Sequence, residues 1–124
     1  MIYFFVSGDK ILASSRTRAY MICDRLAKYK ERGEVHRVVM RPFWNFSSPR
    51  LKEFFRNFKI FFNSKKEDVF ILQKTISQLD FILIVLFFKI FFNKKIYFDF
   101  DDAIFLYSKK MKIKTIILCK ISNG

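Results

Sequence analysis

Three carboxylates stand close together in the segment IYFDFDDAIF, where Asp99, Asp101 and Asp102 follow an apolar run. Carboxylates this close repel one another unless a partner lies between them. Suitable partners are a metal ion, another cation, backbone N–H groups or sugar hydroxyls, so the segment predicts a binding site. In the alternative interpretation an Asp caps the following turn, which accounts for one carboxylate more readily than for three.

A second group of polar residues follows the first apolar run, in the segment SGDKILASSRTR. Gly8 is expected in a turn, and Ser14, Ser15, Arg16 and Arg18 are expected at the start of a helix. Unpaired N–H groups at a helix start, together with arginine side chains, bind phosphate well. The same spacing fits a serine-capped helix with two solvated arginines, and both interpretations stay open. The spacings of a P-loop and of a dinucleotide-binding GxGxxG motif are absent.

The chain is strongly basic, with 24 Lys and Arg against 11 Asp and Glu and a formal net charge of +13 over 124 residues. Abundant Phe, Ile, Asn and Lys indicate AT-rich coding, which explains part of that charge without a ligand. All eight arginines lie in the first 56 residues, so a bound anion is expected near the N-terminal half. The aromatic residues follow the spacing of a core, so no nucleic-acid partner is expected.

Few residues are suited to nucleophilic or metal chemistry. His36 is the single histidine and falls within a predicted strand, so a Ser/His/Asp or Cys/His centre is not expected. Cys23 and Cys119 are expected to be reduced, buried thiols. With two Cys and one His far apart in sequence, no metal site of those ligands is expected, and no cofactor.

The elements that must position these residues alternate along the chain. Apolar runs predict strands at Ile2–Ser7, Val35–Met40, Asp68–Leu72 and Ile96–Phe100. Helices are predicted from Ser15 to the Gly33 boundary, from the Ser48 cap onward, and over Leu79–Phe92. This order predicts an α/β fold over residues 1–124, a single Rossmann-like domain with a parallel sheet of about four strands and helices on both faces.

Apolar spacing also predicts which helix faces are buried. The expected buried residues are Ala19, Ile22, Cys23 and Leu26 in the first helix and Leu51, Phe54, Phe55, Phe58 and Phe62 in the second. Ligands of such sheets bind outside the carboxyl ends of the strands. The stretches at those ends are 7–18, 41–47, 73–78 and 99–102.

The most apolar stretch, Phe81–Phe92, contains Lys89 and is shorter than the roughly 20 residues of a membrane span. It is predicted to be a buried helix, with a helix lying on a membrane surface as the alternative. No targeting segment is evident at the N-terminus. A cytoplasmic protein is therefore expected, either free or peripheral at the inner face of the membrane.

Two phosphate-handling families fit the acidic segment incompletely. A DxDxT phosphohydrolase of the haloacid dehalogenase type would match Asp99 and Asp101, but Ala103 replaces its Thr. Too little chain follows Asp102 for its other motifs. A receiver domain would carry its acidic pair after the first strand, where this chain has Asp9 alone.

The chain resembles the N-terminal half of a GT-B glycosyltransferase of the large retaining group 1 class. The resemblance rests on SSRTRAYMICDRL, DVFILQK and, above all, KIYFDFDDAIFLYSKK. It implies sugar transfer from a nucleotide sugar to a glycan or lipid-linked acceptor in cell-envelope polysaccharide synthesis. It also implies that this domain holds the acceptor, with Arg16, Arg18, Asp99, Asp101 and Asp102 at the acceptor side. The nucleotide sugar would be held by a second, C-terminal domain, generally without a metal.

Beyond Tyr107 the family pattern continues through a helix into a fifth strand, whereas KMKIKTIILCKISNG ends at Gly124. We therefore expect an incomplete domain that is inactive alone, with an open sheet edge and marginal stability. The alternative expectation is a basic protein that binds a membrane surface without catalysis.

Overall fold

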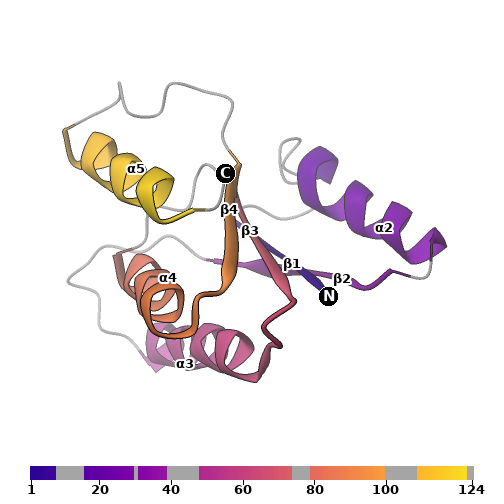
Figure 1. The fold of residues 1–124 in the computed structure, drawn as a ribbon, viewed down its shortest axis with the longest axis horizontal. Coiled ribbons are helices and arrows are strands. Elements are labelled where there is room, and N and C mark those ends of the chain that lie inside the picture. Colours follow the sequence, from indigo (N-terminus) through magenta and orange to yellow (C-terminus); the bar gives the residue numbers. More distant parts are fainter. Residues whose placement is uncertain (8–15, 30, 39–47, 74–78, 100–108, 123–124) are drawn as a thin grey trace.

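A computed structural model describes residues 1–7, 16–29, 31–38, 48–73, 79–99 and 109–122 of the chain. These residues form a four-stranded, wholly parallel sheet with the strand order β2-β1-β3-β4 (Figure 1). The strands are β1 (Ile2–Val6), β2 (Gly33–Arg37), β3 (Val69–Gln73) and β4 (Lys95–Asp99). The predicted α/β, Rossmann-like fold is confirmed.

The four strands start and stop together. Ile2 pairs with both Gly33 and Val69, and Val69 pairs with Lys95, so the amino ends share one edge. At the other edge Val6 lies opposite Arg37, and Gln73 lies opposite Asp99. The sheet therefore has a distinct carboxyl edge, which is where ligands of this architecture bind.

Helices cover both faces of the sheet, as predicted. On one side a π-helical turn, η1 (Arg16–Tyr20), continues directly into α2 (Met21–Lys28). On the other side lie α3 (Ser48–Asn63) and α4 (Leu79–Phe92), with α5 (Lys109–Ile121) packed against α4 and β4 (Figure 1). The helix α5 is an addition to the elements expected from the sequence.

The larger core lies between the sheet and the helices α3, α4 and α5, and it is built mainly of phenylalanine. Phe61 of α3 is its centre: its ring stacks on Phe70 at a centroid distance of 4.2 Å and lies 5.3 Å from Phe5 and 5.4 Å from Phe88. Stacked and tilted aromatic pairs at these distances add to the stabilisation from buried area.

A smaller core joins the opposite face of the sheet to α2. Phe4 and Val6 of β1 point to this side, where they pack with Ala19, Cys23 and Leu26. Successive strand residues face opposite sides of a sheet, so β1 contributes Tyr3 and Phe5 to the larger core and Phe4 and Val6 to the smaller one. This explains why the first strand is apolar at nearly every position.

Several predicted boundaries are wrong by a few residues. The second strand is Gly33–Arg37, not Val35–Met40, and Gly33 begins this strand instead of closing the helix, which ends at Lys28. A Cβ on Gly33 would lie 2.9 Å from the Cys23 Sγ atom. The glycine is therefore present because the helix passes close to the strand, a reason that sequence spacing does not reveal.

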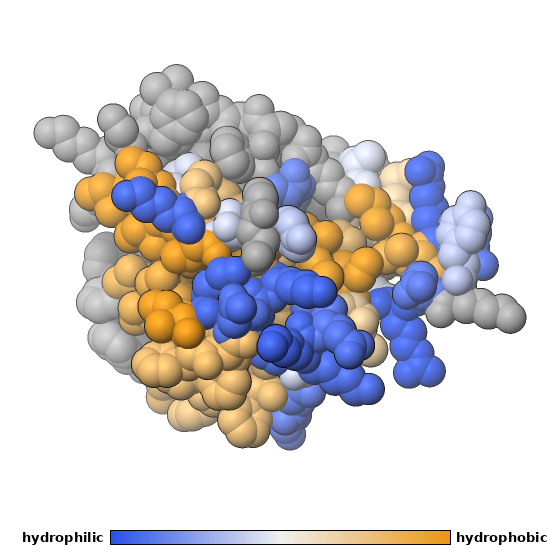
Figure 2. Space-filling view, viewed as in Figure 1, coloured by the Kyte–Doolittle hydropathy of each residue, from blue (hydrophilic) through white to orange (hydrophobic). Residues whose placement is uncertain are grey.

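The predicted buried faces also need correction. In α3 Asn57 and Phe61 are buried, and Phe54 and Phe58 pack against the core as predicted, whereas Phe55 and Phe62 are exposed. Leu51 of α3, Ile22 of α2 and Cys119 of α5 are exposed as well, and Cys23 is only partly buried. The helix predicted at Phe81–Phe92 is present, but it is buried on one side only. Figure 2 shows hydrophobic side chains gathered on the surface where Figure 1 places α3 and α4.

Candidate functional site

The residues selected from the sequence gather toward the carboxyl edge of the sheet, as far as the structure describes them. Asp99 is the last residue of β4 and is partly buried, and Arg16 and Arg18 belong to η1. The remaining predicted site residues lie outside the described ranges; they are Gly8, Ser14, Ser15, Asp101 and Asp102.

The turn η1 lies at the height of the carboxyl edge because of the way α2 returns to the sheet. After α2 the chain reaches β2 within a few residues, and the Ile2 amide donates to the Arg32 carbonyl at the amino edge. Thirteen helical residues from Arg16 to Lys28 extend about 20 Å, slightly more than a five-residue strand. The backbone of Arg16 and Arg18 therefore stands beside the carboxyl end of the sheet.

Asp99 shares its side of the sheet with η1 and α2. In β4, Ile96 and Phe98 point into the larger core, so strand alternation turns Tyr97 and Asp99 to the α2 side. By the same rule, Gln73 of β3, which pairs with Asp99, faces the α2 side too. Asp99 lies two strands from β1, which corresponds to about 10 Å across the sheet.

This part of the sheet combines three kinds of side chain. Tyr97 is 40% exposed, and next to it the carboxylate of Asp99 and the amide of Gln73 end neighbouring strands. The exposed ring offers an apolar surface and the partly buried carboxylate of Asp99 offers hydrogen-bond acceptors, whereas Gln73 is only 3% exposed and its amide lies beneath them. The sequence singled out Asp99 and the stretch that begins at Gln73, but not Tyr97, although the alternation of strand residues places Tyr97 and Asp99 on one face.

His36 and Cys23 take no part in this edge. The ring of His36 lies 5.9 Å from that of Tyr3 and 5.5 Å from that of Phe5, and its Nε2 atom lies 3.2 Å from Glu34. Burial lowers the pKa of His36, although Glu34 partly opposes this, so the ring is neutral at pH 7. Burial and then the carboxylates of Asp24 and Glu34 raise the pKa of Cys23, which keeps the thiol protonated.

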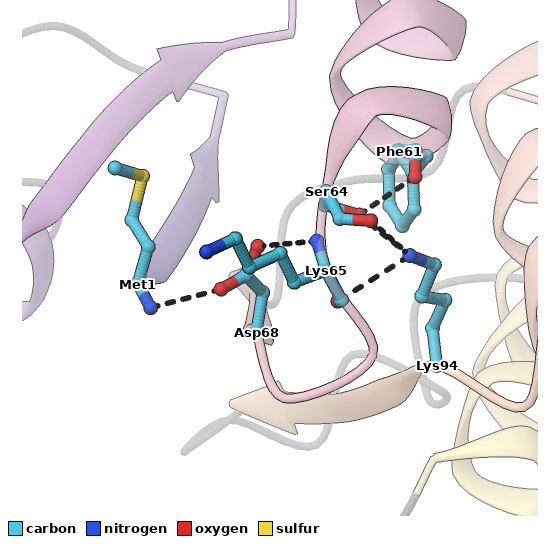
Figure 3. A network of polar contacts seen from close by, with 6 residues as sticks. All are labelled: Met1, Phe61, Ser64, Lys65, Asp68 and Lys94. Atoms are coloured by element: carbon cyan, nitrogen blue, oxygen red, sulfur yellow. Dashed lines mark hydrogen bonds and ion pairs between the residues drawn. The ribbon is translucent and has the colours of Figure 1, made fainter.

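The opposite, amino edge of the sheet carries a network of polar contacts (Figure 3). The buried side chain of Lys94 reaches the end of α3, where its Nζ atom donates to the Ser64 carbonyl at 2.7 Å and lies 2.9 Å from the Ser64 hydroxyl. A longer contact of 3.4 Å joins Nζ to the Lys65 carbonyl. The ammonium group thus satisfies the Ser64 carbonyl at the helix end and adds a second donor to the Lys65 carbonyl, which also accepts from the Asp68 amide at 3.2 Å.

Asp68 is the second centre of this network. Its carboxylate accepts hydrogen bonds from the Met1 ammonium group at 2.9 Å and from the Lys65 amide at 2.7 Å. Burial by itself would raise the pKa of Asp68, but these two donors, with the charges of Met1 and Lys94, lower it below its usual value. Burial lowers the pKa of Lys94, and the charge of Asp68 partly opposes this.

A surface pocket of about 480 Å³ opens beside the network, at the amino edge. Its lining residues are Met1, Tyr3, Glu31, Arg32, Asn63, Lys65, Glu67 and Asp68. Three cationic groups stand against three carboxylates there, so the pocket selects neither an anion nor a cation. It also lies at the end of the sheet away from Asp99 and η1.

Neither a metal centre nor a membrane span is present in the parts of the chain that the structure describes. Among those residues no three His, Cys, Asp or Glu side chains gather closely enough to hold a metal ion. None of the described helices has both the length and the apolar character needed to cross a bilayer.

Comparisons with protein-family models and with curated proteins find no match.

Proposed function

We propose that the chain is the acceptor-binding domain of a sugar-transferring enzyme of the GT-B type. It would hold a glycan or lipid-linked acceptor at the carboxyl edge of the sheet, at the cytoplasmic face of a membrane. In the family that the sequence resembles, the nucleotide sugar is held by a second domain, which these 124 residues do not include. The proposal therefore assigns acceptor binding, and not catalysis, to this domain.

One observation carries the proposal: Asp99 and Gln73 end neighbouring strands at the carboxyl edge, and they share a face of the sheet with Tyr97 and with the turn that contains Arg16 and Arg18. Sugar hydroxyls both donate and accept hydrogen bonds, so a carboxylate and an amide on adjacent strands suit them. The apolar C–H face of a sugar ring packs on an aromatic ring such as that of Tyr97. Two arginines near a helix start suit a phosphate carried by the acceptor.

The test is to titrate the labelled chain with a hexose phosphate, a neutral disaccharide and UDP-glucose while following amide chemical shifts by NMR. We expect the hexose phosphate to shift amides in η1 and at the ends of β3 and β4. Calorimetry with UDP-glucose should give no measurable binding, because the donor site belongs to the other domain. Micromolar binding of UDP-glucose, or shifts confined to other parts of the chain, would contradict the proposal.

Two substitutions sharpen this test. Asp99→Asn and Tyr97→Ala should each weaken hexose phosphate binding by about tenfold, since each removes one hydrogen-bonding or packing contact. The matched controls are Asp24→Asn and Tyr29→Ala, which change an exposed carboxylate and an exposed ring of the α2 segment near the opposite edge. Equal losses in variants and controls would show a non-specific effect.

A further inference from the structure

The outer side of α4 is an apolar surface that no described part of the chain covers. Apart from Asp80 and Lys89, every residue of this helix is hydrophobic. Its exposed side chains are Leu79, Leu83, Phe87, Ile90, Phe91 and Phe92. A helix that is hydrophobic all round is normally buried, because exposing it to water is costly. This helix therefore needs a partner on its outer side.

The apolar surface continues from α4 onto α3. The ring centroid of Phe58 in α3 lies 6.1 Å from that of Phe87 in α4 and 6.4 Å from that of Phe62. The ring centroids of Phe87 and Phe91 lie 4.9 Å apart. Phe55, Phe62 and Phe91 are 64%, 62% and 71% exposed. We call the exposed residues of this surface the aromatic face; they are Leu51, Phe55, Phe62, Leu83, Phe87, Ile90, Phe91 and Phe92. The helices α3 and α4 both return from the carboxyl to the amino edge, so the face extends roughly 20 Å along them.

A basic stripe borders the aromatic face on α3. Lys52, Arg56 and Lys59 follow one another at helical spacing, and all three are exposed. Arg56 also donates from its guanidinium group to the Arg37 carbonyl of β2 at 2.9 Å, so Lys52 and Lys59 are the cations of this stripe that the inference uses. Glu53 is the single acidic residue between Leu51 and Phe62. Aromatic side chains beside a row of positive charges match the two layers of an anionic bilayer surface, apolar chains beneath negatively charged headgroups.

From this combination we infer that the aromatic face docks on an anionic lipid bilayer, with α3 and α4 lying flat in its interface. Phe55, Phe62 and Phe91 enter the boundary of the acyl chains, and Lys52 and Lys59 contact the headgroups. The inference rests on the outer surface of the helices and not on the proposed sugar site. Failure of one would leave the other standing.

A second copy of the chain suits this face less well. A symmetric dimer would bring each aromatic face against its twin and set the two basic stripes near each other. Like charges at such a boundary destabilise the contact, and Glu53 is the single acidic residue in that part of α3 to offset three basic ones. Charge complementarity thus favours a negatively charged surface as the partner.

The experiment is vesicle flotation of the whole chain with two lipid compositions. One set of vesicles contains phosphatidylcholine alone, and the other contains phosphatidylcholine mixed with phosphatidylglycerol. We expect the chain to float with the anionic vesicles, to float at least tenfold less with the neutral ones, and to be released by salt. Circular dichroism of the same preparation verifies that the chain is folded.

Two double variants separate the apolar and electrostatic parts. Phe62→Ser with Phe91→Ser should lower binding by tenfold or more, because two exposed rings no longer enter the bilayer. Lys52→Glu with Lys59→Glu should lower it similarly and weaken its salt dependence. The matched controls on α2 are Tyr29→Ser and the pair Arg25→Glu with Lys28→Glu, which should bind as the unchanged chain does.

Three results would overturn the inference. The first is a folded chain that does not float with the anionic vesicles. The second is loss of binding by the variants on α2 to the same extent as by the variants on α3 and α4. The third is a dimer in light scattering that Phe62→Ser with Phe91→Ser converts to a monomer, without lipid binding by either form. The hexose phosphate titration is independent of these outcomes, so it tells failure of docking apart from failure of the sugar site.

Discussion

At the scale of single residues, Lys94 makes several of the polar contacts at the amino edge of the sheet. Its Nζ atom donates to the carbonyls of Ser64 and Lys65 at the end of α3. Lys94→Met keeps the length and apolar stem of the side chain but removes the donor to the Ser64 carbonyl, whereas the Lys65 carbonyl still accepts from the Asp68 amide at 3.2 Å. We expect it to lower the free energy of unfolding by about 1 to 3 kcal/mol, measured by urea denaturation.

The neighbouring residue gives a matched control for Lys94. Lys95 is exposed, so Lys95→Met should change the free energy of unfolding by less than about 0.5 kcal/mol. A Lys94→Met chain as stable as the unchanged one would mean that water replaces the ammonium group at the helix end.

Asp68 should make stability depend on pH in the acid range. Its pKa in the folded chain is lower than the ordinary value of 3.8, so the folded state binds this proton less readily than the unfolded state. The stabilisation is therefore complete above pH 3.8 and is lost as the pH falls through the lowered pKa. Asp68→Asn should cost about 1 to 3 kcal/mol at pH 7, and the difference should vanish at the acid end of a pH series of urea titrations.

Exposed Glu67 serves as the control for that series, and Glu67→Gln should shift the curve by less than about 0.5 kcal/mol at each pH. A constant difference between the unchanged chain and Asp68→Asn across all pH values would argue against a role for the charge.

At the scale of secondary-structure elements, the approach of α2 to β2 depends on Gly33. A methyl group at this position would meet Cys23 Sγ at 2.9 Å and Leu26 Cδ1 at 3.2 Å. Gly33→Ala should therefore destabilise the fold by about 1 to 3 kcal/mol in thermal or urea unfolding. In the double variant with Cys23→Ala the cost of the new methyl group should be smaller, because the closest atom is gone. Equal costs in both backgrounds would show that Cys23 does not limit the approach.

The strands were more predictable than the helix faces. Strands β1, β3 and β4 contain short apolar runs next to turn signals, and the apolar run that predicted β2 overlaps it at Val35, so each strand lies within one to three residues of its predicted position. The helix α4 is apolar on nearly every side, and the apolar side of α3 is wider than the part that meets the sheet. Periodicity alone cannot choose which part of such a helix meets the sheet. In α3 the residues that pack toward the sheet include Phe54 and Phe61 together with the polar Asn57, whereas Phe55 and Phe62 are exposed.

The candidate site was predicted in part, by a topological rule and not by a motif. Parallel strands share a carboxyl edge, and this was enough to single out Asp99 and the segment that contains Arg16 and Arg18. The pairing of β3 with β4, which brings Gln73 beside Asp99, depends on strand order. Strand order results from long-range packing, so it could not be read from the local sequence.

At the scale of the whole molecule, phenylalanine builds both the interior and the exposed aromatic face, and two nearby residues of α4 distinguish these roles. Phe88 is completely buried, and its ring centroid lies 5.0 Å from that of Phe58 and 5.4 Å from that of Phe61. Phe91, in contrast, is exposed. Phe88→Asp places a carboxylate among aromatic rings and should cost more than about 4 kcal/mol, enough to unfold the chain. Phe91→Asp should stay within about 1 kcal/mol of the original stability and leave the elution volume of the chain unchanged, because its side chain is 71% exposed. Circular dichroism and size-exclusion chromatography measure the two effects. Unfolding of both variants would mean that the outer side of α4 is as essential to the fold as its inner side.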